Sequence, residues 1–466
     1  MASTDLSKPD VDDGPELKRV LGPGLLLLFM IGDMLGAGIY TLTGKVAGIV
    51  GGAVWIPLLV AFVVATLTAC SYLELVTKYP KPAGAALYTH KAFGIHFLTF
   101  IVAFAVLCSG ITSASTASRS FAANFAEAFD ISLGEGIGIT LVALAFLLVI
   151  AAINLRGVGE SVKLNVGLTI IEASGLLIIL LVGAWALGGG DGDWSRVTDI
   201  SLPEGKSAFA AIGSGTALAF FALIGFEDSV NMAEETKNPA KIFPRMMLTA
   251  LAIVGTLYIV IGIIAVALVP LDQLSQGSTP LLQVVEAGAS GFPLWIFAFI
   301  TMFAVSNTAL INMLMASRLV YGMSRERVIP KALGSVHRTR RTPWVAIAFT
   351  TVLGLVLVGF INEITSLADT TTLLLLAVFS VVNVAVLVLR RDKVEHEHFR
   401  TPTVLPVLGA IVCVHLVTPA IDRDAEVYKT AGILLGVGVV LWVANAIHRH
   451  SGDANASRIE NPGRLS

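Results

Sequence analysis

Long apolar runs alternate with short polar connections along almost the whole chain. A helix of about 20 apolar residues matches the roughly 30 Å hydrocarbon core of a bilayer. The pattern predicts about twelve such helices, at residues 23–48, 52–77, 94–126, 137–154, 162–188, 208–233, 246–270, 292–321, 343–361, 366–389, 404–420 and 430–447. The segment 270–290 is too polar to span, and we expect a short external helix there, over the entrance. The pattern therefore predicts an all-helical membrane protein.

The first apolar run contains the step Gly36-Ala37-Gly38, which lets a helix unwind. Each glycine costs a helix roughly 1 kcal/mol, and backbone groups freed at membrane depth need protein, water or a ligand as partners. Gly225 interrupts the sixth run at the corresponding place half a chain later. Paired breaks are typical of inverted-repeat transporters. The alternative is that these glycines only allow close helix packing.

The breaks divide most of the chain into two halves of five spans each. Five is an odd number, so the second half has the opposite orientation in the membrane. We predict one membrane domain at 21–450, with inverted repeats at about 21–190 and 207–390 and then two extra helices. Tails are expected at 1–20 and 451–466.

Basic residues are distributed unevenly between alternate connections. Most of the 31 Lys and Arg residues lie in one set of connections and in the two tails, while the opposite set holds acidic stretches such as 191–199. Short basic connections stay on the cytoplasmic side. We therefore predict a multi-pass protein of the plasma or inner membrane, with an even number of spans and both termini cytoplasmic.

Composition excludes several other classes of protein. Hydrophobic residues make up 55% of the 466 residues and charged residues only 14%, against about 25% charged in soluble domains. The three cysteines lie inside apolar runs, which argues against a disulfide framework. No Walker-type loop, His-Glu-x-x-His or Gly-x-Ser-x-Gly motif occurs. We predict that the chain is not an enzyme, has no cofactor or metal, and does not bind nucleic acid.

Five short stretches carry a resemblance to a known family. They lie at 32–40 (GDMLGAGIY), 80–88 (PKPAGAALY), 154–158 (NLRGV), 225–239 (beginning GFED) and 317–330 (beginning SRLVYGMSR). In this order they resemble the amino acid–polyamine–organocation permeases, most closely the branch that contains cationic amino acid transporters. The resemblance implies the leucine-transporter fold, with broken helices 1 and 6 and alternating access around a midplane site.

The first break suits a carboxylate, because free N–H groups at the start of a helix carry partial positive charge. The resemblance assigns the substrate α-carboxylate to the amides of the Gly36-Ala37-Gly38 step, and the α-ammonium to carbonyls in helices 1 and 6. Phe221 is expected either to gate the substrate or to be a core aromatic. The predicted substrate-binding residues are Met34, Gly36, Ala37, Gly38, Phe221, Ile224 and Gly225.

Three acidic residues inside the spans are predicted to act in coupling or gating: Asp33, Glu172 and Glu227. A lipid-facing acid costs about 2.5–3.5 kcal/mol, so these face the interior. Many relatives have a lysine near the position of Glu172, where it takes the place of a coupling sodium ion. Two neighbouring carboxylates such as Asp33 and Glu172 do not both ionise readily, so the pair can hold a proton or form a cation site. Glu172 and Glu227 have structural hydrogen bonding as their alternative role.

Together these features predict a secondary active amino acid transporter, by proton symport or by exchange. Alternatives are a polyamine or amine carrier, an amino acid/amine antiporter and, more remotely, a transporter-like nutrient sensor. The expected partners are an amino acid, protons and the lipid bilayer. Association with a small membrane subunit or with further copies of the chain stays open.

Overall fold

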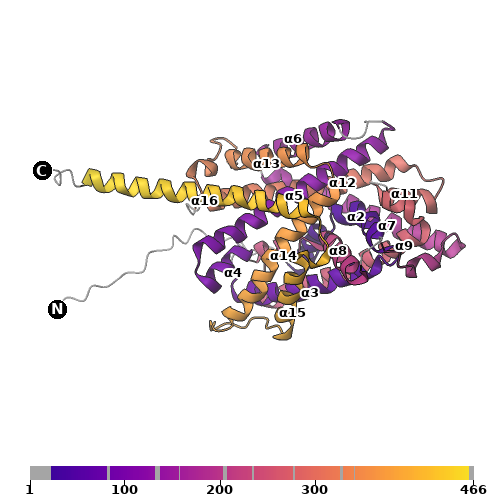
Figure 1. The fold of residues 1–466 in the computed structure, drawn as a ribbon, viewed down its shortest axis with the longest axis horizontal. Coiled ribbons are helices and arrows are strands. Elements are labelled where there is room, and N and C mark those ends of the chain that lie inside the picture. Colours follow the sequence, from indigo (N-terminus) through magenta and orange to yellow (C-terminus); the bar gives the residue numbers. More distant parts are fainter. Residues whose placement is uncertain are drawn as a thin grey trace.

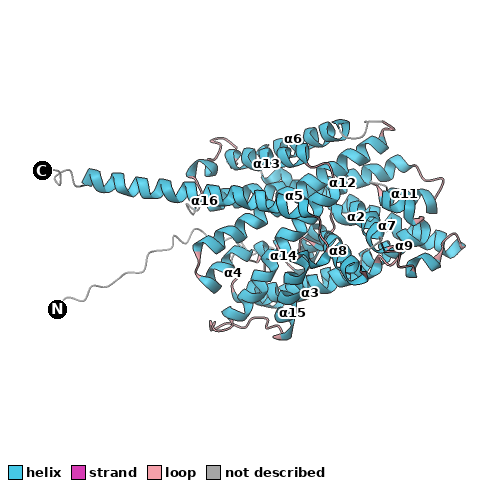
Figure 2. Cartoon of the chain, in the orientation of Figure 1, coloured by secondary structure: helices cyan, strands magenta, loops and turns pink. Residues whose placement is uncertain are grey.

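The computed structural model describes residues 22–80, 84–131, 137–156, 158–202, 207–233, 236–276, 279–325, 329–340 and 342–460. Throughout these ranges the regular structure is helical, and no strand forms in them (Figure 2). The predicted all-helical class is confirmed. The predicted tail at 1–20 lies outside the described residues.

Helical structure occupies every predicted span. Among the described residues, nine helices are long and apolar enough to cross a membrane, and the bent pair α1–α2 makes a tenth. Two further apolar helices, α13 and α15, are shorter, with 17 and 14 residues. The helices at the predicted spans are α1 Pro23–Met34, α2 Ala37–Val50, α3 Trp55–Lys78, α5 His96–Ala128, α6 Ile139–Arg156, α7 Val158–Gly189, α8 Ala208–Phe220, α9 Pro239–Leu268, α12 Leu294–Arg325, α13 Trp344–Phe360, α14 Ile364–Leu389, α15 Val404–Val417 and α16 Ala425–Glu460.

Several short elements join these helices. The segment 270–290 forms two helices instead of the single one expected, because Pro280 begins a second helix after the first has ended. Both pack against α2. The short elements are α4 Gly84–Phe93, α10 Leu271–Gln276, α11 Pro280–Gly288, and the 3₁₀ turns η2 Trp194–Thr198, η3 Phe221–Leu223, η4 Asp228–Met232, η5 Lys331–Gly334 and η6 Pro419–Ile421.

Both predicted helix breaks are present. α1 ends at Met34, Leu35 and Gly36 are extended, and α2 begins at Ala37 with its axis bent by 42°. In the sixth span, α8 ends at Phe220 and the chain continues through η3 and η4 instead of an α-helix. Between these turns Ile224 is extended, and Gly225 has a φ of +126°.

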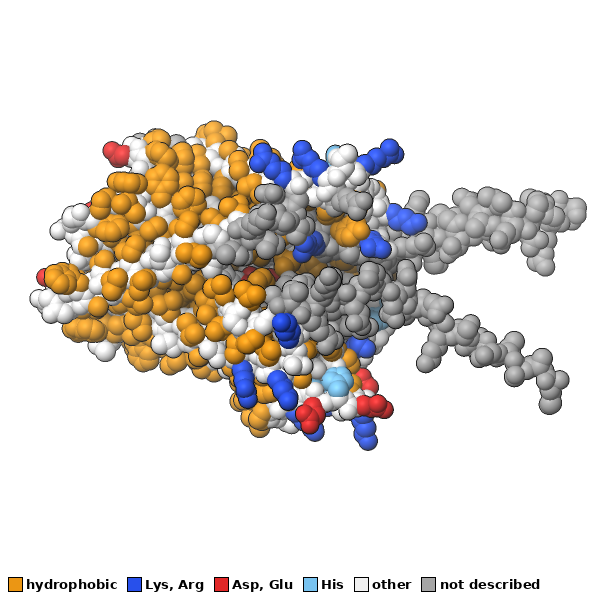
Figure 3. All heavy atoms as spheres, turned by 180° about the vertical axis from the view of Figure 1, so that it is seen from behind, with side chains coloured by type: hydrophobic (Ala, Val, Ile, Leu, Met, Phe, Trp, Pro, Cys, Tyr) orange, Lys and Arg blue, Asp and Glu red, His pale blue; other side chains and the backbone are white. Residues whose placement is uncertain are grey.

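The helices form an elongated bundle from one end of which α16 projects (Figure 1). α16 continues to Glu460, into the stretch predicted as a tail. Apolar side chains cover the bundle over much of its length, and Lys and Arg side chains gather towards one end (Figure 3). Exposed basic residues at the helix ends and connections include Lys91, Arg325, Arg338 and Arg391.

Candidate functional site

The two helix breaks contact each other through backbone. A Cβ atom on Gly225 would lie 2.6 Å from the Asp33 carbonyl oxygen, and one on Gly38 would overlap the main chain of Ala222. The positive φ of Gly225 is also a conformation that other residues rarely adopt. Close packing, the alternative role for these glycines, is therefore part of the structure, and it brings the two breaks into one site.

A cavity of about 30 Å³ lies where the breaks meet. That volume holds a water molecule or two and is far too small for an amino acid. All seven predicted substrate-binding residues line it, together with Asp33. Their function in binding stays a prediction. The remaining lining residues are Gly32, Leu35, Ser113, Ala222, Asp228, Asn307, Thr308, Ile311 and Asn312.

Thr308 of α12 faces the first turn of α2. Its Oγ1 accepts the N–H of Ala37 at 3.0 Å, and a Cβ on Gly36 would lie 3.2 Å from the same atom. N–H groups of a first helical turn have no acceptor within their own helix. The threonine hydroxyl therefore occupies the position on α2 where the sequence predicts a carboxylate.

The carbonyl side of the site is partly occupied as well. The Tyr258 hydroxyl of α9 donates to the Met34 carbonyl at 2.9 Å, so this expected ammonium acceptor already has a partner.

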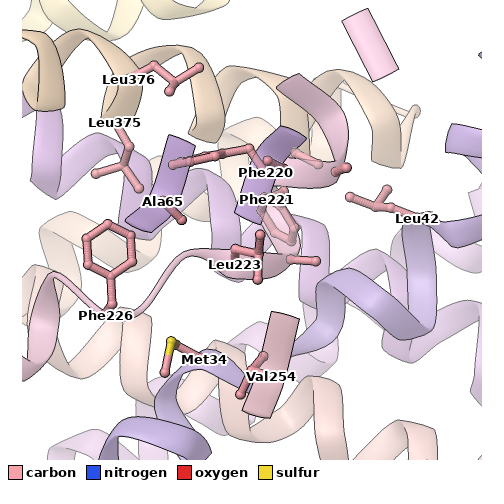
Figure 4. Close-up of a cluster of buried hydrophobic side chains, with 14 of the residues drawn as sticks. Met34, Leu42, Ala65, Phe220, Phe221, Leu223, Phe226, Val254, Leu375 and Leu376 are labelled. Atoms are coloured by element: carbon pink, nitrogen blue, oxygen red, sulfur yellow. The ribbon is translucent and has the colours of Figure 1, made fainter. Parts of the chain in front are cut away.

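Phe220 and Phe221 lie together on one side of the second break, and Phe226 lies on the other side (Figure 4). The Phe226 ring packs against Tyr72 and Phe379, with ring centres 6.0 and 5.5 Å apart. Phe379 also packs against Phe220, with ring centres 6.0 Å apart, so one ring contacts both sides of the second break.

The break in the sixth span places a cluster of acids next to Asp33. Asp228 and Glu227 both act electrostatically on Asp33. Glu227 accepts the N–H of Gly225 at 2.9 Å, which is the helix-fixing hydrogen bond considered as its alternative role. Asp33 and Asp228 line the cavity, whereas Glu227 does not. One carboxyl oxygen of Asp33 is buried without a hydrogen-bond partner in the described structure.

Glu172 lies apart from the cavity, on α7. Its side chain is 0% exposed, and among the described residues neither carboxyl oxygen has a hydrogen-bond partner of ordinary geometry, although the Asn307 amide lies beside it. Tyr40 donates to the Glu172 carbonyl at 2.7 Å. The acids next to Asp33 are those of the sixth span, and Glu172 is not among them. Glu172 faces tyrosines and amides instead, so it does not form the carboxylate pair with Asp33 that the sequence suggested.

Among the polar residues of the cavity, sequence reasoning missed Ser113, Thr308 and Asp228. Thr308 and Ser113 are isolated polar residues in apolar helices, and their orientation depends on how α12 and α5 pack. Asp228 follows Glu227 directly in a motif that was recognised, so its type and position were a usable signal. No group of three His, Cys, Asp or Glu residues able to hold a metal occurs in the described ranges.

A helical bundle with two discontinuous spans that meet at a polar cavity is the arrangement typical of inverted-repeat membrane transporters. The family model described as "Amino acid permease" matches residues 25–444. The chain belongs to this family, which confirms the resemblance noted in the sequence and makes the protein a permease, not an enzyme.

Curated relatives agree with the family assignment. A branched-chain amino acid permease of Bacillus subtilis is 28% identical over 423 residues, covering 86% of this chain and 88% of that protein. A methylthioribose transporter of Bacillus subtilis is 26% identical over 453 residues, covering 92% of each. Cationic amino acid transporter 9 of Arabidopsis thaliana, a chloroplastic protein, is 27% identical over 343 residues, covering 70% of this chain and 58% of that protein.

Proposed function

We propose that this permease carries an amino acid across the cell membrane by alternating access at the cavity between the two helix breaks. The observation that carries the proposal is the start of α2, where the Ala37 N–H meets a polar group of another helix inside that cavity. A helix N-terminus favours a carboxylate, and a charged acceptor binds an N–H more strongly than a hydroxyl does. The substrate α-carboxylate would displace Thr308 from Ala37, and binding would widen the cavity.

Protons are the proposed coupling ion, and Glu172 is the proposed carrier. A buried carboxyl without hydrogen-bond donors is stable when it is neutral, so its protonation state can change with its surroundings. Glu172 of α7 has such an environment, because it is buried and neither of its carboxyl oxygens has a hydrogen-bond partner of ordinary geometry. In symport by this mechanism, Glu172 takes up a proton together with the substrate on one side of the membrane and releases it on the other. Exchange uses the same conformational cycle without net proton flow.

A second candidate substrate class is an amine or polyamine. Asp33 and Asp228 both line the cavity, and carboxylates attract a cation. The methylthioribose transporter among the relatives also shows that a similar sequence is named for a substrate that is not an amino acid.

Uptake into proteoliposomes tests these proposals. Purified protein is reconstituted and supplied with labelled amino acids, polyamines and methylthioribose, with an imposed pH gradient or sodium gradient. We expect accumulation of an amino acid driven by the pH gradient, with loss of accumulation but persistence of counterflow in Glu172→Gln. Uptake of an amine alone would favour the second candidate, and accumulation driven by sodium would contradict proton coupling.

A further inference from the structure

Asn307 of α12 lines the cavity, and its amide also bonds to Asn165 and Thr169, which lie on the same face of α7 as Glu172. It is buried, with 1% of its surface exposed. The next residue along the helix is Thr308, which binds the first turn of α2. Two consecutive positions of one helix therefore reach the predicted carboxylate position and the predicted coupling acid.

The Asn307 amide has a fixed orientation. Its Oδ1 accepts a hydrogen bond from Asn165 of α7 at 2.7 Å, and its Nδ2 donates to Thr169 of α7 at 3.3 Å. The amide nitrogen has two hydrogens, so one of them is available for Glu172 or for a group in the cavity. The Glu172 carboxylate and a substrate carboxylate in the cavity would compete for this one donor.

From this geometry we infer that Asn307 links substrate binding to protonation of Glu172. The Glu172 oxygens have no hydrogen-bond partner of ordinary geometry in the structure, and when the cavity holds no carboxylate the free N–H of Asn307 would turn towards Glu172 and stabilise its ionised form. A substrate carboxylate at the start of α2 draws this donor towards the cavity, and Glu172, left without a donor in a dry environment, takes up a proton. Substrate and proton then favour each other's binding, and thermodynamic linkage makes the effect equal in both directions.

The other groups around Glu172 do not supply this link. The titratable groups that face it are Tyr40 of α2 and Tyr258 of α9. α6, α11 and α12 also pack against α7, and Gly32 of α1 closely approaches Thr169. Among the described residues of these helices, Asn307 is the side chain whose amide approaches the Glu172 carboxyl. The tyrosine hydroxyls already donate to the carbonyls of Glu172 and Met34. The inference rests on the proposed function, because it takes Glu172 as the coupling acid.

The test is the pH dependence of binding, measured as thermal stabilisation of the purified full chain by an equal mixture of the twenty standard L-amino acids. For one linked proton, apparent affinity should fall up to about tenfold per pH unit across the alkaline part of a range from about pH 5 to about pH 8. Asn307→Ala should remove this slope. Asn165→Ala should weaken the slope while keeping acid-side affinity, since Asn165 does not line the cavity.

Asn312→Ala is the matched control. Asn312 is an asparagine of the same helix that lines the same cavity, but its amide donates to the Thr308 carbonyl of its own helix at 2.9 Å. Asn312→Ala should keep the wild-type slope of apparent affinity against pH, whatever its affinity at a given pH. Glu172→Gln should bind the amino acid mixture with an affinity that does not change with pH.

Each contrary result has its own meaning. If Glu172→Gln loses the slope while Asn307→Ala and Asn165→Ala keep it, the link through Asn307 is wrong and the coupling acid stands. A slope that persists in Glu172→Gln removes Glu172 as the coupling acid, and a wild type without a slope contradicts the linkage. No stabilisation of the wild type by the mixture overturns amino acid binding itself. If Asn307→Ala fails to fold, Asn307→Ser and Asn165→Ala decide in its place.

Discussion

At the scale of single residues, the site is built from backbone and from small polar groups. Glycines let two helix breaks touch, and one threonine hydroxyl satisfies an N–H at the start of α2. These positions were partly readable from sequence, because glycines at matching places in two repeats are typical of paired helix breaks. Glu172 was readable as a buried acid, but its surroundings were not, since they depend on how α7 packs on α12 and α9.

Gly225→Ala should destabilise the folded protein. The new Cβ would lie 2.6 Å from the Asp33 carbonyl oxygen, at a φ of +126° that alanine rarely adopts. Strain of this kind costs on the order of 1–3 kcal/mol. Thermal unfolding in detergent would measure it, with Gly322→Ala as control, because a Cβ at Gly322 meets nothing within 4 Å. Equal stability of the two variants would contradict the proposed backbone contact.

Thr308→Val should lower the stability of the ligand-free protein but increase its stabilisation by an amino acid. The variant leaves the buried Ala37 N–H without its 3.0 Å acceptor, at a cost of about 1–3 kcal/mol. A substrate carboxylate would replace the missing acceptor, so ligand binding would recover that energy. Thermal shift with and without the amino acid mixture measures both effects. Thr308→Ser keeps the hydroxyl and should behave like wild type, and a smaller ligand shift in Thr308→Val would show that the hydroxyl helps to hold substrate.

At the scale of helices, most of the fold followed from the sequence. Bilayer thickness fixes the length of an apolar helix, so spans could be located without tertiary information. The short helices were predicted less well. α4, with ten residues, was not predicted, and the single helix expected at 270–290 is divided into α10 and α11, whose six and nine residues are too few for a clear periodic pattern. Which side chains line the cavity could not all be predicted from the sequence either, because this depends on the rotation of each helix in the bundle.

The end of α3 is joined to the end of α14 by an ion pair in which Glu74 is buried and Arg390 is partly exposed. Arg390 donates to both carboxyl oxygens of Glu74, at 2.9 and 2.8 Å, and the N–H of Thr401 donates to the same carboxylate. Arg390→Met leaves the Glu74 charge buried and unpaired, which should cost about 3–5 kcal/mol. The double variant Glu74→Met/Arg390→Met should recover much of the loss.

Thermal unfolding measures this effect, and an exposed pair provides the comparison. Glu426 and Lys429 form an ion pair with side chains 65% and 64% exposed. Glu426→Gln should change stability by no more than about 1 kcal/mol. A loss in Arg390→Met as small as this would show that the Glu74–Arg390 pair does not hold the two helices together.

At the scale of the whole molecule, the two ends of the bundle differ in charge (Figure 3). We predict that the basic end is cytoplasmic. A cysteine replacing Trp194 of η2, which is 58% exposed, should react with an impermeant reagent from outside the cell. A cysteine replacing Arg338, on the basic connection after η5, should react only after permeabilisation. The native Cys70, Cys108 and Cys413 are buried and are replaced first. The opposite labelling pattern would reverse the orientation.

The contact between the two broken spans has a consequence for how such a protein can diversify. Gly38 meets Ala222 and Gly225 meets the Asp33 carbonyl, main chain against main chain, so this joint does not depend on the identity of the large side chains nearby. Ser113, Ile311 and Asn312 come from α5 and α12, outside the joint. Exchanging those three side chains for ones of other size or polarity would change what the cavity accepts while the two broken spans keep their contact. The side chains that select the substrate and the backbone contact that joins the two broken spans are thus separate parts of one chain.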